Sequence, residues 1–165
     1  MKKRSVFIDA IEVIVTAVVI TYLLFHFVLI SAKVNGSSMY PTLRDGEFGY
    51  SFVVTKNMGI NRFDICVVDV ENKKLVKRVI GLPNEVISYF NNQLYVDGTA
   101  IADVVGDDVY TSDFSIMLGE DEYFCLGDNR EISRDSRFYG AFKQDKVVST
   151  HLFVIYPFDQ FGFKN

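Results

Sequence analysis

Residues 74–82 read KLVKRVIGL, an aliphatic run interrupted by a Lys-Arg pair. Aliphatic and β-branched residues at this density favour an extended strand, in which successive side chains point to opposite faces. On one face Lys77 lies between Leu75 and Val79, and Arg78 points to the other. The stretch therefore predicts a buried strand that holds one lysine on an apolar face.

Similar runs occur on both sides of this strand, with Gly, Asn and Asp between them. They are FGYSFVVT (48–55), DICVVDV (64–70), EVISYF (85–90), QLYVDG (93–98), EYFCLGD (122–128) and KVVSTHLFVIYPF (146–158). Short runs rich in Val, Ile, Tyr and Phe are typical of β folds, and EVISYF and QLYVDG read as a hairpin over Asn91-Asn92. No amphipathic helix is evident after residue 33, and residues 106–115 read as a looser segment. We expect a mostly antiparallel β fold.

The N-terminal part of the chain has a different composition. Residues 13–32, VIVTAVVITYLLFHFVLISA, contain no formally charged side chain. Their length matches the roughly 20 residues that a helix needs to cross a bilayer. A cleavable signal peptide is the alternative, but its apolar segment is typically about 7 to 15 residues long, and Lys33 follows where small residues would be needed. We expect a retained transmembrane helix.

The charge pattern around this segment predicts its orientation. Residues 2–4 are Lys-Lys-Arg, and positively charged flanks favour the cytoplasmic side of a membrane. The sequence thus divides into residues 1–32, a short cytoplasmic N-terminus with a transmembrane anchor, and residues 33–165, an extracytoplasmic β domain. We expect a single-pass protein of the cytoplasmic membrane.

Composition excludes several classes of function. The net charge of the 165 residues is −4, and no basic stripe follows the first four residues, so nucleic acid is not an expected partner. Cys66 and Cys125 both stand in strand-like runs, where we expect buried thiols rather than a disulfide, although an exterior domain permits one. Neither an HExxH pattern nor a Cys/His cluster occurs. We expect no metal and no cofactor.

The segment GSSMYPTL, residues 36–43, carries two adjacent serines, Ser37 and Ser38, either of which needs a base to act as a nucleophile. His151 is the only histidine outside the predicted anchor, and no orienting acid is evident near it in the sequence. A lysine serves instead if burial lowers its pKa by about two units or more. Lys77 has the apolar setting for this, although a lysine between apolar neighbours is also typical of an edge strand.

The segment GDNREISRDSR, residues 127–137, has six charged residues of both signs. It reads either as a solvated loop with turn residues at its start or as a compact, salt-bridged platform beside a site.

Together, three segments resemble the type I signal peptidases, membrane-anchored serine proteases that remove signal peptides from exported proteins. GSSMYPTL is similar to the family's nucleophile box, in which Ser-Met, any residue and Pro-Thr follow one another. KRVIGLP looks like the box of the general-base lysine, and GDNREISRDSR agrees with GDNR-x-x-S-x-D-S-R at every specified position. The order of the boxes, the anchor and the closing YPF-x-x-FG fit as well, so the resemblance covers essentially the whole chain.

The resemblance implies roles for individual residues. Ser38 would be the nucleophile and Lys77 the general base. The N–H of Ser38 would bind the oxyanion, and Gly36 stands where some relatives have a serine, so that no hydroxyl assists there. Ser133 would orient the lysine through a hydrogen bond.

The same resemblance implies supporting and substrate-binding residues. Asp135 would pair with neighbouring arginines, with Arg78 and Arg137 as the candidates. Shallow apolar pockets would accept the small side chains at positions −1 and −3 of the substrate. The residues that border these pockets would be Val34, Met39, Leu75 and Val76.

The sequence departs from the family pattern at two positions. Asn84 and Phe63 stand where the family usually has glycine, and asparagine tolerates positive φ better than most residues.

The expected partners are preprotein signal peptides and membrane lipid. A self-cleaving repressor with a Ser-Lys dyad is one alternative, against which the anchor argues. A non-catalytic, signal-peptidase-like assembly factor or chaperone for a surface structure such as a pilus is the other.

Overall fold

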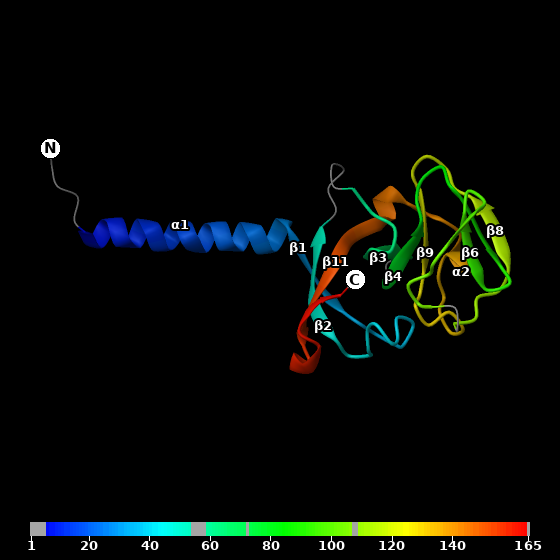
Figure 1. Ribbon diagram of the computed structural model, residues 1–165. Coiled ribbons are helices and arrows are strands. Elements are labelled where there is room, and N and C mark those ends of the chain that lie inside the picture. Colours follow the sequence, from blue (N-terminus) through cyan, green and yellow to red (C-terminus); the bar gives the residue numbers. More distant parts are fainter. Residues whose placement is uncertain (1–5, 54–58, 72, 107–108, 165) are drawn as a thin grey trace.

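The computed structural model describes residues 6–53, 59–71, 73–106 and 109–164 (Figure 1). An exposed helix, α1 (Val6–Phe27), projects away from a β domain. Its 22 residues span roughly 33 Å at 1.5 Å per residue, enough to cross the hydrocarbon core of a bilayer. Among the described residues this is the one helix long and apolar enough to do so.

The helix differs from the predicted span at both ends. It begins at Val6 and ends at Phe27, whereas residues 29–32 were expected to continue it. They instead begin β1 (Leu29–Lys33), which pairs with β2 (Phe48–Val53). Pairing satisfies the backbone of this strand, and the burial of Ala32 in the core of the β domain fixes it there. Residues 2–4, used to predict the orientation, lie outside the described residues.

The larger sheet has eight strands in the order β1-β2-β11-β3-β4-β9-β10, with β12 paired to β11, and all its pairs are antiparallel. Its other members are β3 (Ile65–Val70), β4 (Lys73–Gly81), β9 (Glu122–Leu126), β10 (Phe142–Lys143), β11 (Val147–Tyr156) and β12 (Gly162–Lys164). A mostly antiparallel β fold is confirmed, and each of the seven predicted runs contains a strand.

A smaller sheet lies at the end of the domain opposite α1 (Figure 1). Its strands, in the order β7-β6-β5-β8, are β7 (Thr99–Ile101), β6 (Gln93–Val96), β5 (Val86–Phe90) and β8 (Phe114–Met117). The predicted hairpin over Asn91-Asn92 is confirmed, with both asparagines at positive φ. β8 begins inside the segment expected to be loose. Three short helices complete the domain: α2 (Ser136–Tyr139), η1 (Gln144–Lys146) and η2 (Phe158–Gln160).

Strand β4 lies where three apolar clusters meet. Val79 belongs to a cluster within the larger sheet, and Ile80 belongs to a cluster between the two sheets. Val76 packs against a third cluster, which contains Ala32, Val34, Met39, Leu43, Ile65, Leu152 and Val154. Because β4 is held on both faces, the side chains that it carries into the site are fixed by the core.

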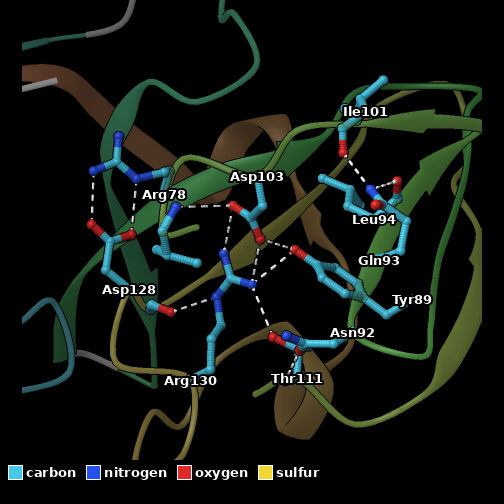
Figure 2. A network of polar contacts seen from close by, with 12 residues as sticks. Arg78, Tyr89, Asn92, Gln93, Leu94, Ile101, Asp103, Thr111, Asp128 and Arg130 are labelled. Carbon is cyan, nitrogen blue, oxygen red and sulfur yellow. Dashed lines mark hydrogen bonds and ion pairs between the residues drawn. The ribbon is translucent and has the colours of Figure 1, made fainter. Parts of the chain in front are cut away.

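A buried polar network joins the smaller sheet to the loop after β9 (Figure 2). Its centre is Arg130, whose side chain is 0% exposed and whose Nη1 and Nη2 donate to Asp103 at 2.6 and 3.0 Å. Nη1 also donates to Tyr89 at 2.8 Å and to Thr111 at 3.1 Å, and Tyr89 donates to Asp103. The loop that carries residues 127–137 is therefore anchored at Arg130.

Candidate active site

Ser38 and Lys77 lie in contact, although 39 positions separate them in the sequence. The Nζ of Lys77 is 2.7 Å from the Oγ of Ser38, a hydrogen-bonding distance. Ser38 lies in the turns between β1 and β2, where Met39 and Leu43 are buried and hold the segment against the core. The serine is half-buried, whereas the lysine side chain is enclosed by the sheet.

The apolar face predicted for Lys77 is confirmed. Lys77 is 2% exposed and lies opposite Cys66 in the register of β3 and β4. Cys66 and Cys125 are free thiols, fully buried, with Sγ atoms 3.8 Å apart. Burial lowers the pKa of the Lys77 amine below its ordinary 10.5, although Asp135, Cys66 and other neighbours raise it. A lysine that loses its proton more readily is better suited to act as a base.

A groove of about 330 Å³ opens beside this pair. One wall is formed by residues 33–35 with Ser38 and Met39, and the other by residues 73–77 of β4. The four residues expected to border the substrate pockets all line this groove, namely Val34, Met39, Leu75 and Val76. The structure therefore brings the predicted nucleophile, base and substrate-binding residues to one place.

The groove exposes an unpaired strand edge. Residues 73–78 of β4 pair with β3 on one side, but β9 pairs with β4 only from Arg78 onward. Within the described part of the chain no strand covers the other edge of residues 73–77, and Asn35 on the facing wall makes no hydrogen bond. An extended peptide in the groove would find backbone donors and acceptors there.

Asp128 joins the segment of Ser38 to the strand of Lys77, a role that the sequence did not predict. It accepts from Arg78 Nε at 2.8 Å and Nη2 at 2.7 Å, and from the Thr42 hydroxyl at 2.6 Å. Arg78 directly follows Lys77, and Thr42 lies four residues after Ser38. The available signal was the position of Asp128 in GDNR, although a turn residue fits that position equally well.

The arginine partners differ in part from those expected. Asp135 pairs with Arg137, whose Nε and Nη2 both donate to it at 2.9 Å. Arg78 was the other candidate, but its guanidinium pairs with Asp128. Asp135 also accepts from the Gly127 N–H at 3.0 Å, so that it stabilises the start of its own loop.

Ser133 has a different setting from the one expected. Its Oγ is buried and has no hydrogen-bond partner among the described residues, so the expected bond to Lys77 is not formed. A Cβ added to Gly127 would lie 2.2 Å from this Oγ and 2.5 Å from the carbonyl oxygen of Ser38. The Asn129 N–H donates to the same carbonyl at 3.0 Å. Loop 127–137 thus packs directly on the main chain of Ser38.

This packing predicts the effect of Gly127→Ala. The added methyl group meets a backbone oxygen of Ser38 that cannot move without displacing the nucleophile. A displacement of about 1 Å lowers catalysis by roughly 100-fold. We expect a loss of this size in kcat/KM, measured on a peptide substrate. The matched control is Gly59→Ala, because nothing lies within 4 Å of a Cβ there. Full activity of Gly127→Ala would contradict the close contact.

The remaining candidates lie apart from this chemistry. His151 contacts Thr150 at 2.9 Å and Asp64 at 3.8 Å, and it does not line the groove. The N–H of Gly36 donates to Asp45 at 2.7 Å, whereas that of Ser38 has no acceptor among the described residues. Ser38 therefore retains a backbone donor for an oxyanion. Within the described ranges no three His, Cys, Asp or Glu side chains are grouped as metal ligands.

A serine hydroxyl in contact with a buried lysine, beside an open groove with a free strand edge, is the arrangement of a serine peptidase. The family profile for signal peptidase, peptidase S26, matches residues 7–156. The chain belongs to this family.

Individual relatives agree with this assignment. Signal peptidase I S of Bacillus subtilis is 35% identical over 173 residues, which cover 96% of this chain and 94% of that protein. Signal peptidase IB of Staphylococcus aureus is 32% identical, with 98% and 94% covered. A crystal structure of a signal peptidase I from Enterococcus faecalis has a TM-score of 0.52 and 31% identity, covering 56% of this chain and 97% of that one. With the apolar helix α1, these relatives indicate a membrane-anchored serine protease.

Proposed function

We propose that this protein is a signal peptidase that cleaves N-terminal signal peptides from exported preproteins, with Ser38 as nucleophile and Lys77 as general base. The observation that carries the proposal is the 2.7 Å contact between the Ser38 hydroxyl and the buried Lys77 amine, inside a groove that suits an extended peptide. The names of its relatives support the substrate class.

The reaction follows from these positions. Neutral Lys77 accepts the Ser38 proton as Oγ attacks the carbonyl carbon before the scissile bond, and the Ser38 N–H binds the oxyanion. As the C–N bond breaks, Lys77 returns the proton to the leaving amine, and an ester to Ser38 remains. Lys77 then deprotonates a water molecule that attacks this ester. The acid product leaves, and Ser38 regains its proton from Lys77.

The groove accounts for a preference for small side chains near the cut. A substrate paired with the free edge of β4 would point alternate side chains into the wall, as in any β strand. Val34 and Met39 close that wall and are 4% and 1% exposed, so the space in front of them is shallow. Alanine at positions −1 and −3 fits this space, whereas a bulky side chain would lift the peptide from Ser38.

The membrane arrangement is part of the same proposal. Helix α1 would cross the membrane with residues 2–4 in the cytoplasm, placing the β domain on the outer side. Exposed aromatic rings at the C-terminal end support contact of the domain with lipid, because such rings favour the membrane interface. They are Tyr156, Phe158, Phe161 and Phe163. A non-catalytic assembly factor has no observation in its favour, since both members of the dyad are present.

Cleavage of a defined preprotein tests the proposal. The full chain in non-ionic detergent should cut a preprotein with an Ala-x-Ala site directly after the second alanine, as identified by the masses of both products. The same preprotein with phenylalanine at −1 should remain uncut, because the groove is shallow there. Absence of cleavage by the wild-type chain, or equal cleavage of both preproteins, would contradict the proposal.

The pH dependence of kcat/KM should report the base. Because burial lowers the pKa of Lys77, activity should rise through alkaline pH with a midpoint below 10.5. The same shift makes protonation unfavourable in the folded state, so the free energy of unfolding should also rise with pH between the lowered pKa and 10.5. An activity profile already flat from about pH 6 would instead indicate a histidine base.

A further inference from the structure

Three lysines line the groove that opens beside Ser38. Lys33 lies on one wall, Lys73 and Lys74 lie on the other, and none of the described residues that line the groove is acidic. We call Lys33, Lys73 and Lys74 the lysine cluster. Lys73 and Lys74 precede Lys77 by four and three residues along β4, which corresponds to roughly 10 to 13 Å at 3.3 Å per residue. The chain as a whole has a net charge of −4, so the charge of this groove differs in sign from that of the chain.

The three ammonium groups are available to a ligand. Within the described part of the chain none of them forms an ion pair or a side-chain hydrogen bond, whereas Lys143 lies 4.0 Å from Asp121 and Lys164 donates to Gln160 at 2.9 Å. Asp69 is the register partner of Lys74 across β3 and β4, yet the two side chains form no ion pair. All three lysines are exposed to solvent.

The apolar section of the groove fixes which part of a substrate reaches the cluster. In a peptide that runs parallel to β4, residues −1 and −3 would occupy the section beside Ser38, bordered by Leu75 and Val76. The peptide that precedes them then continues along β4 toward Lys73 and Lys74. At one residue per strand position, residues about four to six before the cleaved bond lie beside the cluster.

We propose that the lysine cluster selects preproteins that carry a carboxylate side chain four to six residues before the cleavage site. The proposal rests on the proposed function and adds a substrate class to it. Lysine is also common on exposed strand edges, which accounts for Lys73 and Lys74 alone. Lys33 lies on the opposite wall in β1, which pairs with β2 and is also an edge strand, so an edge position accounts for each lysine singly but not for their presence on both walls of one groove. Positive charge on both walls of one groove points to an anionic ligand between them.

The test compares three preproteins that are identical except for glutamate, glutamine or lysine at position −5. With the full chain in non-ionic detergent at low salt, kcat/KM should be about three- to tenfold higher for glutamate than for glutamine, and lowest for lysine. The glutamate-to-glutamine ratio should approach one in Lys73→Gln/Lys74→Gln/Lys33→Gln, and also in about 1 M salt, where the screening length is about 3 Å. The matched control, Lys143→Gln/Lys146→Gln, should keep the wild-type ratio.

Each other outcome has a definite meaning. Equal cleavage of the three preproteins would overturn the selection and leave the proposed function intact, whereas cleavage of none would overturn both. A ratio that survives the triple substitution would place the selectivity elsewhere. A charge effect that appears only with vesicles containing anionic lipid would assign the cluster to phosphate headgroups, and would also overturn the proposal.

Discussion

The Lys77→Met variant should cleave an Ala-x-Ala preprotein at least about 1,000-fold more slowly than the wild type. Methionine keeps the length and apolar character of the side chain but offers no amine to accept the proton of Ser38. Ser38→Ala should lose activity to a similar extent, because it removes the nucleophile. The measurement is kcat/KM at a mildly alkaline pH, at which the wild-type lysine is more readily deprotonated.

Stability separates this loss from unfolding. Lys77 is 2% exposed, and its burial is unfavourable when the amine is charged, so Lys77→Met should melt at an equal or higher temperature than the wild type. The matched control for the serine is Ser37→Ala, which alters the exposed neighbour and should remain active. Undiminished activity of Ser38→Ala or Lys77→Met would rule out the dyad.

Asp103→Ala should destabilise the β domain by about 3 to 5 kcal/mol, because it leaves the guanidinium of Arg130 buried without its counter-charge. The side chains of Arg130 and Asp103 are 0% and 7% exposed, so water cannot replace the lost carboxylate without opening the fold. The remaining partners of the guanidinium, namely Tyr89, Thr111 and the carbonyl of Gly127, are neutral (Figure 2). Thermal unfolding should show a fall in Tm of about 10 °C.

The matched control is Asp121→Ala, which removes an exposed carboxylate 4.0 Å from Lys143 and should cost at most about 1 kcal/mol.

The loss of stability at acidic pH provides a second measurement of the same ion pair. Burial raises the pKa of Asp103, but hydrogen bonds and charge from Arg130 outweigh it and lower the pKa below 3.8. The pair therefore stabilises the fold above that pH, and its contribution is lost as the pH falls through the lowered pKa. Equal loss of stability in both variants would contradict a special role for the buried pair.

Seven of the strands were predictable because each lies within its own apolar run. KLVKRVIGL contains β4 and places Lys77 on the correct face, and Asn84 has the positive φ, 67°, that its place in the turn suggested. Phe63, the other departure from glycine, is also at positive φ, 72°. The predicted C-terminal end of the transmembrane helix was wrong. Residues 29–32 are as apolar as the helix, and only their pairing with β2 shows that they form a strand.

The site residues that were predicted lie in the three segments that resemble family motifs. The partners that were missed come from distant segments. Asp103 and Arg130 are 27 positions apart, and Asp128 meets Thr42 across 86 positions. Either acid would serve equally well on a solvated loop, and only burial turns it into a structural ion pair. The sequence pattern alone does not show whether these acids are buried, because their burial depends on how the two sheets pack.

The free edge of β4 also bears on how this protein behaves at high concentration. An uncovered strand edge can take up a strand from a second molecule and so begin aggregation. If two copies paired through residues 73–77 in antiparallel fashion, the lysines of one would approach those of the other, and like charges on neighbouring strands repel. Lys73 and Lys74 should therefore disfavour self-association through this edge. The edge then stays unpaired and the protein monodisperse until a substrate peptide binds.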